Sequence, residues 1–457
     1  MCGIVGISHH KEASKMAFLG LYALQHRGEE AAGIATYDGK DLHVIKKSGL
    51  AVDNFDESNI SQLKGHVAIA HTRYSTTGSS TVKNIQPIVV THRKKPMAVA
   101  HNGNLTNTEE LCAKLEEEGS IFQTSMDSEV VMHLLAKAPN GDIRKWFTHV
   151  LTQLKGAFSF VFLYQDHIIG VRDPQGFRPL CLGKLGDGYI LASESCAFDL
   201  MKAEFVREIE PGEVVIIKGN KLESFFLPGA KGQRPAQCVF ENVYFARPDS
   251  HIFNDNVYQV RKRLGAQLAK EHPAKADFVM GIPDSGNYAA LGYAQELDIP
   301  FEIGMIRNHY IGRTFIQPTQ FLREFRVRVK LNPIREMIKG KRVIVVEDSI
   351  VRGTTSRNRI AEIREAGATE IHMRISCPPI VSPCFYGIDF PSSNELIAHN
   401  KTVQEIADFI QVDSLGYLSL QGMLGVMKEK GNFCSACFTG KYPVPIPKNT
   451  DKLKMEP

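Results

Sequence analysis

Two segments in the second half of the chain pass from an apolar strand through a polar loop into a helix, and this repeated order constrains the fold most. Phe278–Ile282 has the composition of a buried strand, and a helical pattern over 288–297 follows a Pro-Asp-Ser-Gly-Asn loop. Arg342–Val346 repeats the order and leads to a helical stretch over 357–366 that Gly367 ends. Strands and helices that alternate in this way form a mostly parallel sheet covered by helices. The sequence therefore predicts an α/β domain in this half.

The chain up to about Pro228 has a different pattern, in which short apolar runs are separated by Gly, Asn and Asp. Lys15–Leu24 and Asp127–Ala138 have apolar residues at helical spacing. The other runs predict strands, and the clearest of them are Val67–Ala70, Met97–Ala100, Phe158–Leu163 and Ile168–Val171. We expect packed sheets with helices outside them in this half.

A stretch rich in Gly, Pro and basic residues, Pro228–Pro235, separates the two patterns and has the composition of a linker. We therefore predict a first domain over residues 1–229 and a second domain over residues 230–402. Residues 403–457 are expected to form a helical C-terminal segment that ends in a polar tail.

The composition is that of an ordinary globular protein, with 43% hydrophobic and 23% charged residues. A net charge of +4 is too small to indicate nucleic acid binding, and the one basic stretch, Arg323–Lys330, suits a local anion site better. We find no apolar run long enough to span a membrane and no signal-peptide pattern at the N-terminus. Nine cysteines in such a chain favour the cytoplasm, where cysteines act as nucleophiles, metal ligands or core residues.

The second residue of the chain is a cysteine, Cys2, and a small residue at this position allows removal of Met1. Cys2 would then carry a free α-amino group, whose ordinary pKa of about 8 leaves part of it neutral near pH 7. The amine can accept the thiol proton, and the thiolate is the nucleophile. A cysteine at position 2 is by itself more often incidental, so this assignment depends on other segments.

Three segments further along carry polar residues at the ends of predicted elements. Arg73 follows a strand and can hold a carboxylate through two hydrogen bonds. Asn102 and Gly103 follow another strand, where a side-chain amide and a backbone N–H can form an oxyanion hole. Asp127 begins a predicted helix, where it can hold an ammonium group or merely cap the helix.

Together and in this order, these segments resemble the class II glutamine amidotransferases, whose glutaminase domain has the N-terminal nucleophile hydrolase fold, an αββα sandwich. The resemblance extends to Gln25–Gly28, Arg172–Leu180 and Ala192–Ser195. The chain departs from the family near Glu29–Ala31, where Gln and Ser are frequent.

This resemblance implies a role for each of the polar residues. Cys2 would attack the side-chain amide of glutamine, and Asn102 and Gly103 would stabilise the oxyanion. Arg73 would bind the substrate carboxylate, and Asp127 would bind its α-amino group. A thioester on Cys2 would then be hydrolysed to glutamate.

The segment after the apolar run Val343–Val346 has the residue types of a metal and phosphate site. Glu347 and Asp348 end the strand, where two carboxylates can bind ribose hydroxyls and a hydrated Mg²⁺. A buried strand that ends in a solvated acidic turn is the alternative, and the glycine–lysine phosphate loop of many NTPases does not occur. The loop and the start of the next helix suit a phosphate, through Ser349, Arg352, Gly353, Thr354 and Thr355.

This segment resembles the signature with which type I phosphoribosyltransferases bind phosphoribosyl pyrophosphate (PRPP). The amidotransferases among them usually have two aspartates where this chain has Glu347 and Asp348, a pair that is usual elsewhere in the fold. The resemblance implies a Mg²⁺ site formed by Ser285, Glu347 and Asp348. It also implies that Arg313 to about Lys330 form a loop that closes over PRPP, although a solvated basic loop is the alternative.

Asn242–Ser250, Pro283–Gly286 and Tyr310–Ile316 narrow the resemblance to the amidophosphoribosyltransferase family. Such an enzyme passes ammonia from glutamine through a protected channel to C1 of PRPP and forms 5-phosphoribosylamine, glutamate and pyrophosphate at the entry to purine biosynthesis. We expect glutamine and PRPP as substrates, purine nucleotides as feedback inhibitors, and a homo-oligomer. One alternative is another glutamine amidotransferase, such as a glucosamine-phosphate or asparagine synthase, which would lack the PRPP loop. The other is a non-catalytic PRPP-sensing regulator, which would need a basic face but not Cys2.

Cys434 and Cys437 form a C-x-x-C pair near the C-terminus, and two thiolates at this spacing can reach one metal centre. Four thiolates suit zinc as well as an iron–sulfur cluster, and free thiols are a third alternative. Cys238 and Cys384 match the positions used by the cluster-bearing subset of the family. The resemblance therefore implies a structural 4Fe–4S cluster on these four cysteines.

Overall fold

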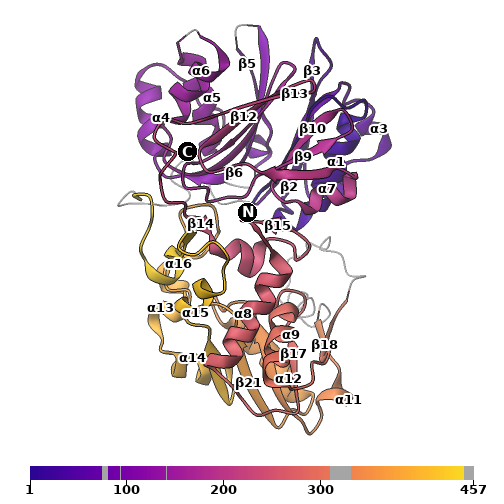
Figure 1. The fold of residues 1–457 in the computed structure, drawn as a ribbon, viewed down its shortest axis with the longest axis vertical. Coiled ribbons are helices and arrows are strands. Elements are labelled where there is room, and N and C mark those ends of the chain that lie inside the picture. Colours follow the sequence, from indigo (N-terminus) through magenta and orange to yellow (C-terminus); the bar gives the residue numbers. More distant parts are fainter. Residues whose placement is uncertain (75–80, 93, 140, 309–330, 447–457) are drawn as a thin grey trace.

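The computed structural model describes residues 1–74, 81–92, 94–139, 141–308 and 331–446. Figure 1 shows a first body built from the chain before about residue 230 and a second body built from the chain after it, with the N-terminus at their junction. The loop predicted over Arg313–Lys330 lies outside the described residues.

The first body contains two antiparallel sheets that face each other. One sheet has the order β11-β9-β10-β1-β4-β2-β3, with strands β1 (Gly3–Ile7), β2 (Ala31–Tyr37), β3 (Leu42–Ser48), β4 (Val67–Arg73), β9 (Cys181–Leu185), β10 (Gly188–Ala192) and β11 (Glu204–Glu208). The other has the order β13-β12-β8-β7-β6-β5, with strands β5 (Ile88–His92), β6 (Lys95–Leu105), β7 (Gly156–Tyr164), β8 (His167–Arg172), β12 (Glu213–Lys218) and β13 (Lys221–Phe226).

Helices cover the outer face of each sheet. Side chains alternate along a strand, so Ile4 of β1 packs between the sheets while its neighbours Val5 and Ile7 pack beneath the outer helices. The outer helices are α1 (Ala13–Ala23) and α7 (Cys196–Met201) on one side, and α4 (Thr108–Glu117), α5 (Asp127–Lys137) and α6 (Ile143–Leu151) on the other. This arrangement confirms the predicted αββα sandwich.

Short helices connect the strands of this body. They are η1 (Gln25–Arg27), α2 (Ala51–Asn54), α3 (Glu57–Ile60) and η2 (Val82–Asn84).

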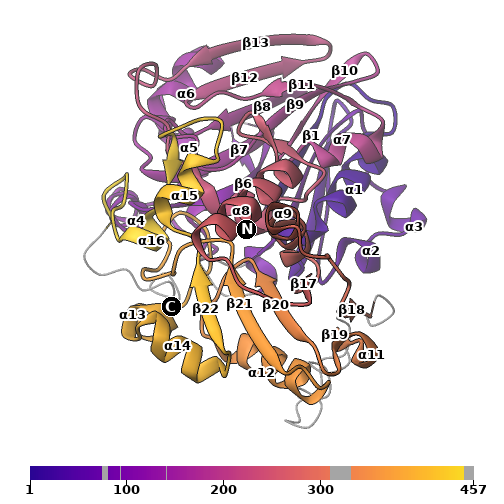
Figure 2. The ribbon, with the colours of Figure 1, turned by 60° about the horizontal axis from the view of Figure 1, so that its bottom comes forward.

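The second body is built on a parallel sheet with the order β17-β20-β21-β22. Figure 2 shows α8 (Val257–Glu271) and α9 (Gly286–Leu297) on one side of this sheet, and α12 (Thr354–Glu365) and α14 (Val403–Ile410) on the other. The strands are β17 (Phe278–Gly281), β20 (Arg342–Glu347), β21 (Glu370–Ile375) and β22 (Ser414–Tyr417). The predicted parallel-sheet domain is therefore confirmed.

The prediction that the chain is helical from Val403 onward is wrong at β22. Leu415 of this strand pairs with Met373 of β21, so a segment near the C-terminus completes the parallel sheet. Pairing with a neighbouring strand decides the conformation of such a short segment more than its own propensity does.

Shorter elements surround this sheet. Three two-stranded pairs are β14 (Gln237–Cys238) with β23 (Phe433–Cys434), β15 (His251–Ile252) with β16 (Asp255–Asn256), and β18 (Met305–Arg307) with β19 (Leu331–Pro333). The short helices are the π-helix η3 (Glu241–Phe245), α11 (Arg335–Ile338), η4 (Ser393–Glu395), α13 (Ile397–Asn400), α15 (Leu420–Gly425) and α16 (Ala436–Thr439).

Candidate active sites

Cys2 lies immediately before β1, where the first body meets the second. The pairing of Gly3 with Thr72 in β4 brings Cys2 beside the end of that strand, and its thiol donates to the carbonyl of Tyr74 at 3.5 Å. Cys2 is 8% exposed, and burial raises the pKa of its thiol. A buried thiol with a raised pKa needs a nearby base to become a nucleophile.

The predicted base is the α-amino group of Cys2, and Met1 is still attached to its nitrogen. The side chain of Met1 is buried in the core of the second body, and burial lowers the pKa of the Met1 α-amino group to about 4. While Met1 is attached, the nitrogen of Cys2 is an amide and cannot accept a proton. Removal of Met1 is therefore a chemical requirement for the predicted nucleophile.

Of the residues predicted for the glutaminase site, Arg73 and Asn102 lie on strands from different sheets. Arg73 ends β4 and is 1% exposed, and Asn102 is fully buried in β6. The two strands are connected where a ring nitrogen of His71 lies 3.1 Å from the carbonyl of His101. Neither polar atom of the Asn102 side chain has a partner among the described residues, so its amide is available to a ligand.

Asp127 is the first residue of α5, but its carboxylate does not cap the helix. One oxygen accepts the backbone N–H of Leu105 at 2.9 Å, and the other lies 3.3 Å from Nδ1 of His101. Burial alone would raise the pKa of Asp127, but His101 and backbone N–H groups outweigh it and lower the pKa. The buried carboxylate therefore keeps its negative charge, as binding an ammonium group requires.

The predicted PRPP residues begin with Glu347, the last residue of β20 in the second body, and continue into the loop that follows. Both oxygens of Asp348 accept hydroxyl hydrogen bonds at 2.5 Å, one from Ser285 and one from Ser349. Glu347 points to α12 instead and accepts the hydroxyl of Ser356 at 3.0 Å. Of the three predicted Mg²⁺ ligands, the structure brings Ser285 and Asp348 into contact, whereas Glu347 is bonded to the helix.

Burial and the neighbouring charge of Asp348 raise the pKa of Glu347 to about 8, and burial raises the pKa of Asp348 as well. Two adjacent carboxylates, of which Asp348 is buried and Glu347 is half-buried, do not both ionise readily. A divalent cation would offset this repulsion, so the pair fits a Mg²⁺ site.

The residues predicted to bind phosphate lie in the loop between β20 and α12 and at the start of that helix, and one of them points elsewhere. Gly353 has a φ of +76° immediately before α12, and a left-handed conformation of this kind favours glycine. Thr354 and Thr355 begin the helix and are exposed. Arg352, however, forms a 2.8 Å ion pair with Glu395 on the surface, so this structure does not bring it to Asp348.

A short series of contacts leads from Cys2 into the second body, toward the acidic pair. The thiol of Cys2 donates to Tyr74, whose ring lies 6.5 Å from that of Phe245, measured between centroids. Phe245 packs edge-on against Tyr244. The pKa of Tyr244 is raised mainly by burial and, to a smaller extent, by the charge of Asp348. Residues of η3 in the second body thus lie between the nucleophile and the acidic pair.

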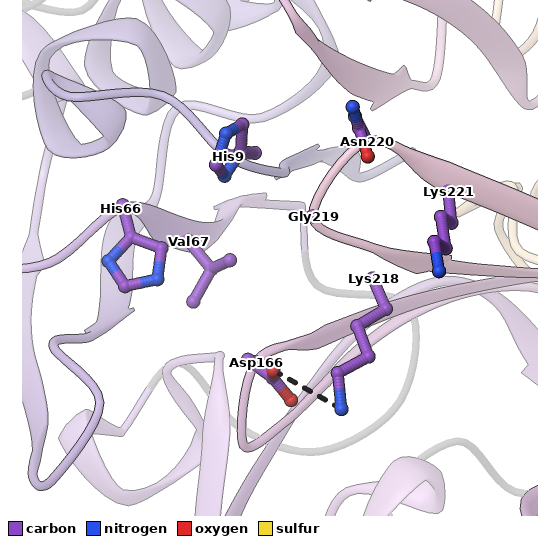
Figure 3. A pocket seen from close by; sticks show the side chains of 8 residues that line it. All are labelled: His9, His66, Val67, Asp166, Lys218, Gly219, Asn220 and Lys221. Atoms are coloured by element: carbon purple, nitrogen blue, oxygen red, sulfur yellow. Dashed lines mark ion pairs between the residues drawn. The ribbon is translucent and has the colours of Figure 1, made fainter.

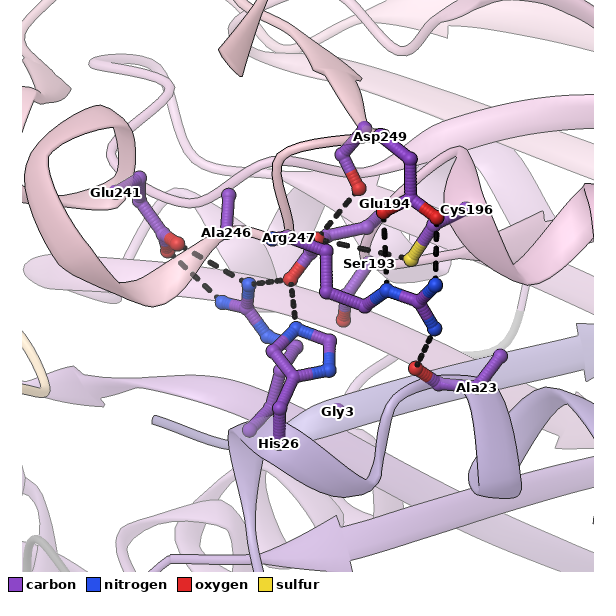
Figure 4. Close-up of polar contacts among 12 residues, drawn as sticks. Gly3, Ala23, His26, Ser193, Glu194, Cys196, Glu241, Ala246, Arg247 and Asp249 are labelled. Atoms are coloured by element: carbon purple, nitrogen blue, oxygen red, sulfur yellow. Dashed lines mark hydrogen bonds and ion pairs between the residues drawn. The ribbon is translucent and has the colours of Figure 1, made fainter. Parts of the chain in front are cut away.

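A buried ion-pair network lies beneath Cys2, and sequence reasoning missed it. Arg27 donates to the carbonyl of Cys2 at 2.9 Å and pairs with Glu194 at 2.5 Å and Glu241 at 2.9 Å. Glu194 also accepts the hydroxyl of Ser250, and Figure 4 shows the contacts around the two glutamates. Glu194 belongs to the first body and Glu241 to the second, so the network joins the bodies. No local pattern could have revealed it, because its members are far apart in the chain.

The four cysteines predicted as ligands meet between the linker and the C-terminal segment. Cys238 pairs directly with Cys434 in the β14–β23 ladder. Burial raises the pKa of the Cys437 thiol, and the nearby thiols of Cys238, Cys384 and Cys434 raise it further. Among the described residues, no group of three or more His, Cys, Asp or Glu side chains is arranged to hold a metal ion.

A cavity of about 310 Å³ lies elsewhere in the first body (Figure 3). It is lined by His9, His66, Lys218 and neighbouring residues, and by none of the predicted site residues. His9 follows the end of β1 that is opposite to Cys2. This cavity therefore belongs to neither candidate site.

None of the described helices is long and apolar enough to cross a membrane.

Comparison with known proteins identifies both halves of the chain. Residues 71–199 match a glutamine amidotransferase domain, and residues 251–410 match a phosphoribosyl transferase domain. The chain is 48% identical over 456 residues to an amidophosphoribosyltransferase of Archaeoglobus fulgidus, covering 98% of this chain and 99% of the relative. It is also 48% identical over 470 residues to one of Methanocaldococcus jannaschii, covering 99% of each.

A solved structure supports the same assignment over the whole chain. It is a glutamine PRPP amidotransferase from B. subtilis complexed with ADP and GMP, with a TM-score of 0.92 and 45% identity. The match covers 98% of this chain and 99% of that one. The chain therefore belongs to the amidophosphoribosyltransferase family.

Proposed function

We propose that this chain hydrolyses glutamine at Cys2 and transfers the ammonia to C1 of PRPP beside Asp348. The observation that carries this assignment is the series of contacts that leads from Cys2 through Tyr74 and Phe245 to Tyr244, whose pKa is raised in part by the charge of Asp348. Ammonia released at Cys2 would pass along this series to the second site. We retain residues 1–229, 230–402 and 403–457 as the proposed domain division, with the third segment contributing strand β22 to the parallel sheet of the second domain.

The glutaminase half-reaction begins when Met1 is removed and the free α-amine of Cys2 accepts the thiol proton. The thiolate attacks the side-chain amide of glutamine, and the Asn102 amide and the Gly103 N–H stabilise the oxyanion. Arg73 holds the substrate carboxylate and Asp127 holds its ammonium group. The α-ammonium group of Cys2 gives its proton to the leaving nitrogen of the tetrahedral intermediate, the C–N bond breaks and ammonia leaves, and water then hydrolyses the resulting thioester to glutamate.

In the second half-reaction, the ammonia attacks C1 of PRPP and pyrophosphate leaves from the same carbon. Ser285 and Asp348 would hold Mg²⁺, with Glu347 as a neighbour bonded to α12. The ion would neutralise the charge that develops on the pyrophosphate. The backbone from Ser349 to Thr355, including Gly353, would bind the 5-phosphate at the start of the helix.

A 4Fe–4S cluster on Cys238, Cys384, Cys434 and Cys437 is part of the proposal. Four thiolates suit zinc as well as a cluster, and the match of these positions to the cluster-bearing subset of the family favours the cluster. A cluster takes one thiolate at each of its four irons. Such a cluster would tie β14 of the linker to β23 of the C-terminal segment.

Purine nucleotides as inhibitors and a homo-oligomeric assembly complete the proposal. The B. subtilis structure is a complex with ADP and GMP, which supports nucleotide binding by a protein of this family. Inhibition of PRPP-dependent activity by AMP, ADP or GMP would test it, and light scattering would give the mass of the assembly.

The central test compares Cys2→Ala with Cys112→Ala, which removes another buried thiol, in α4. Cys2→Ala should abolish glutamine-dependent formation of phosphoribosylamine, while ammonia-dependent formation survives. Cys112→Ala should keep both activities, and mass spectrometry of the active protein should show that Met1 is absent. Glutamine use at the parent rate by the Cys2→Ala protein would refute the assignment, and the absence of both activities from the parent would favour a non-catalytic regulator.

A further inference from the structure

The turn formed by residues 384–387 of the second body lies directly against the backbone of Gly103 in the first. The side-chain amide of Asn104 donates to the carbonyl of Phe385 at 3.1 Å. A Cβ atom added to Gly387 would lie 3.0 Å from the carbonyl carbon of Gly103 and 3.1 Å from its oxygen. The two backbones are therefore in contact with no side chain between them.

Buried contacts of Tyr386 with other elements hold the 384–387 turn in place. The Tyr386 carbonyl accepts a hydrogen bond from Nε of the fully buried Arg178 at 2.9 Å. The Tyr386 ring stacks on Phe177 with 4.3 Å between centroids, and its hydroxyl donates to the carbonyl of Val444 at 2.6 Å. Buried contacts of this kind fix a short turn far more tightly than its own sequence can.

Gly103 is enclosed on its other side as well. Its φ is +154°, and a Cβ atom there would meet the carbonyl oxygen of Ala157 in β7 at 2.1 Å and Nε2 of His101 at 2.8 Å. The backbone of Gly103 thus lies between β7 and the 384–387 turn and has little room to shift. An oxyanion donor contributes fully only when it is aimed at the position that the oxyanion will occupy.

We propose that the 384–387 turn is a positioning element for the oxyanion hole of the Cys2 site. The second body would in this way set the direction of the Gly103 N–H through Gly387 and Phe385. This inference rests on the proposed function, because it assigns the oxyanion to Asn102 and Gly103. It adds that the glutaminase site is complete only when residues from the other half of the chain pack against it.

The test compares Gly387→Ala with Gly39→Ala. The two glycines have nearly the same φ, +105° and +103°, but a Cβ atom at Gly39 would meet nothing within 4 Å. Both variants therefore introduce similar backbone strain, and only Gly387→Ala pushes on Gly103. Asn104→Ala is the milder variant, since it removes the hydrogen bond to Phe385 without adding an atom.

Gly387→Ala should lower kcat of the glutaminase reaction by about 10- to 100-fold, less than the roughly 10²- to 10³-fold for losing a whole oxyanion donor. KM for glutamine should change little, because Arg73 and Asp127 lie on other elements. Ammonia-dependent synthesis and the iron content should match those of Gly39→Ala. The rate at which iodoacetamide alkylates Cys2 should also be unchanged, because alkylation forms no oxyanion. Asn104→Ala should show the same pattern with a smaller loss of kcat, about 3- to 10-fold, because it removes only one hydrogen bond to the turn.

Equal losses of glutamine- and ammonia-dependent activity, or a Gly387→Ala protein that behaves as Gly39→Ala does, would overturn the inference. If Gly387→Ala does not fold, the Asn104→Ala protein decides by the same criteria. The proposed function fails separately, through a Cys2→Ala protein that still uses glutamine.

Discussion

Replacing Arg27 by methionine would remove the cation at the centre of the buried network while keeping a side chain of similar length. Both nitrogens at the end of the guanidinium pair with carboxylates, Nη1 with Glu194 and Nη2 with Glu241, and all three side chains are fully buried. In the variant the two carboxylates remain. Arg178 lies 3.4 Å from Glu241, and a ring nitrogen of His26 lies 2.7 Å from Glu194. The network would then hold too little positive charge for two buried anions.

The expected loss of stability follows from burial. Removing one partner of a buried ion pair costs about 3–5 kcal/mol, because the other charge stays in a medium of low dielectric. An exposed pair contributes only about 0–1 kcal/mol. Arg144 and Glu223 provide the control, since they form a 2.8 Å pair whose side chains are 50% and 64% exposed. Arg27→Met should therefore destabilise the protein by several times more than Arg144→Met, although the ion-pair distances are nearly equal.

The difference in stability between the parent protein and Arg27→Met should also depend on pH. Burial opposes ionisation of Glu194, but His26 and Arg27 outweigh it and hold the pKa of this carboxyl below its usual value near 4.5. A carboxyl with a lowered folded-state pKa adds stability above its unfolded pKa, and this contribution disappears as the pH falls through the folded pKa. The gap between the parent and Arg27→Met should thus be full at pH 7 and shrink in acid.

Urea unfolding followed by tryptophan fluorescence measures this loss. Trp146 is the single tryptophan of the chain and lies in α6 of the first body. Its indole N–H donates to the carbonyl of Leu135 at 2.7 Å, so the signal reports unfolding of the half that contains Arg27. If Arg27→Met and Arg144→Met both cost less than about 1 kcal/mol, the reasoning from burial is wrong.

Asp348→Asn should abolish most PRPP-dependent activity. Glu347→Gln should reduce this activity less, because Glu347 is bonded to Ser356 rather than to Ser285. Equal losses of activity in a steady-state assay would argue against this difference. Arg73→Lys should raise KM for glutamine by roughly 10- to 100-fold, since a lysine cannot make two parallel hydrogen bonds to a carboxylate, and unchanged kinetics would remove Arg73 from the site. Cys437→Ser should reduce the iron content of anaerobically purified protein from about four per chain and lower its urea midpoint; a colourless, fully active parent protein without iron would contradict the cluster.

The sequence by itself determined the elements whose signals are local. The alternation of strand, loop and helix around Phe278–Ile282 and Arg342–Val346 predicts the parallel sheet, because side-chain period and turn residues act over a few positions. The predicted helix at Asp127–Ala138 likewise forms, as Asp127–Lys137. Cys2 and the polar residues at strand ends were identifiable for the same reason, since each belongs to a short motif. Their roles remain proposals that the variants above test.

Only the tertiary structure decided which distant segments meet. Ser414–Tyr417 becomes a strand because β21 offers it a partner, and Arg352 turns to Glu395 although its motif predicts a phosphate contact. The ion pair between Arg27 and Glu241, and the contact of Gly387 with Gly103, join residues from opposite halves of the chain. Such contacts depend on how whole sheets pack, and the energy that selects them comes from burial shared over many residues. No short stretch of sequence contains that information.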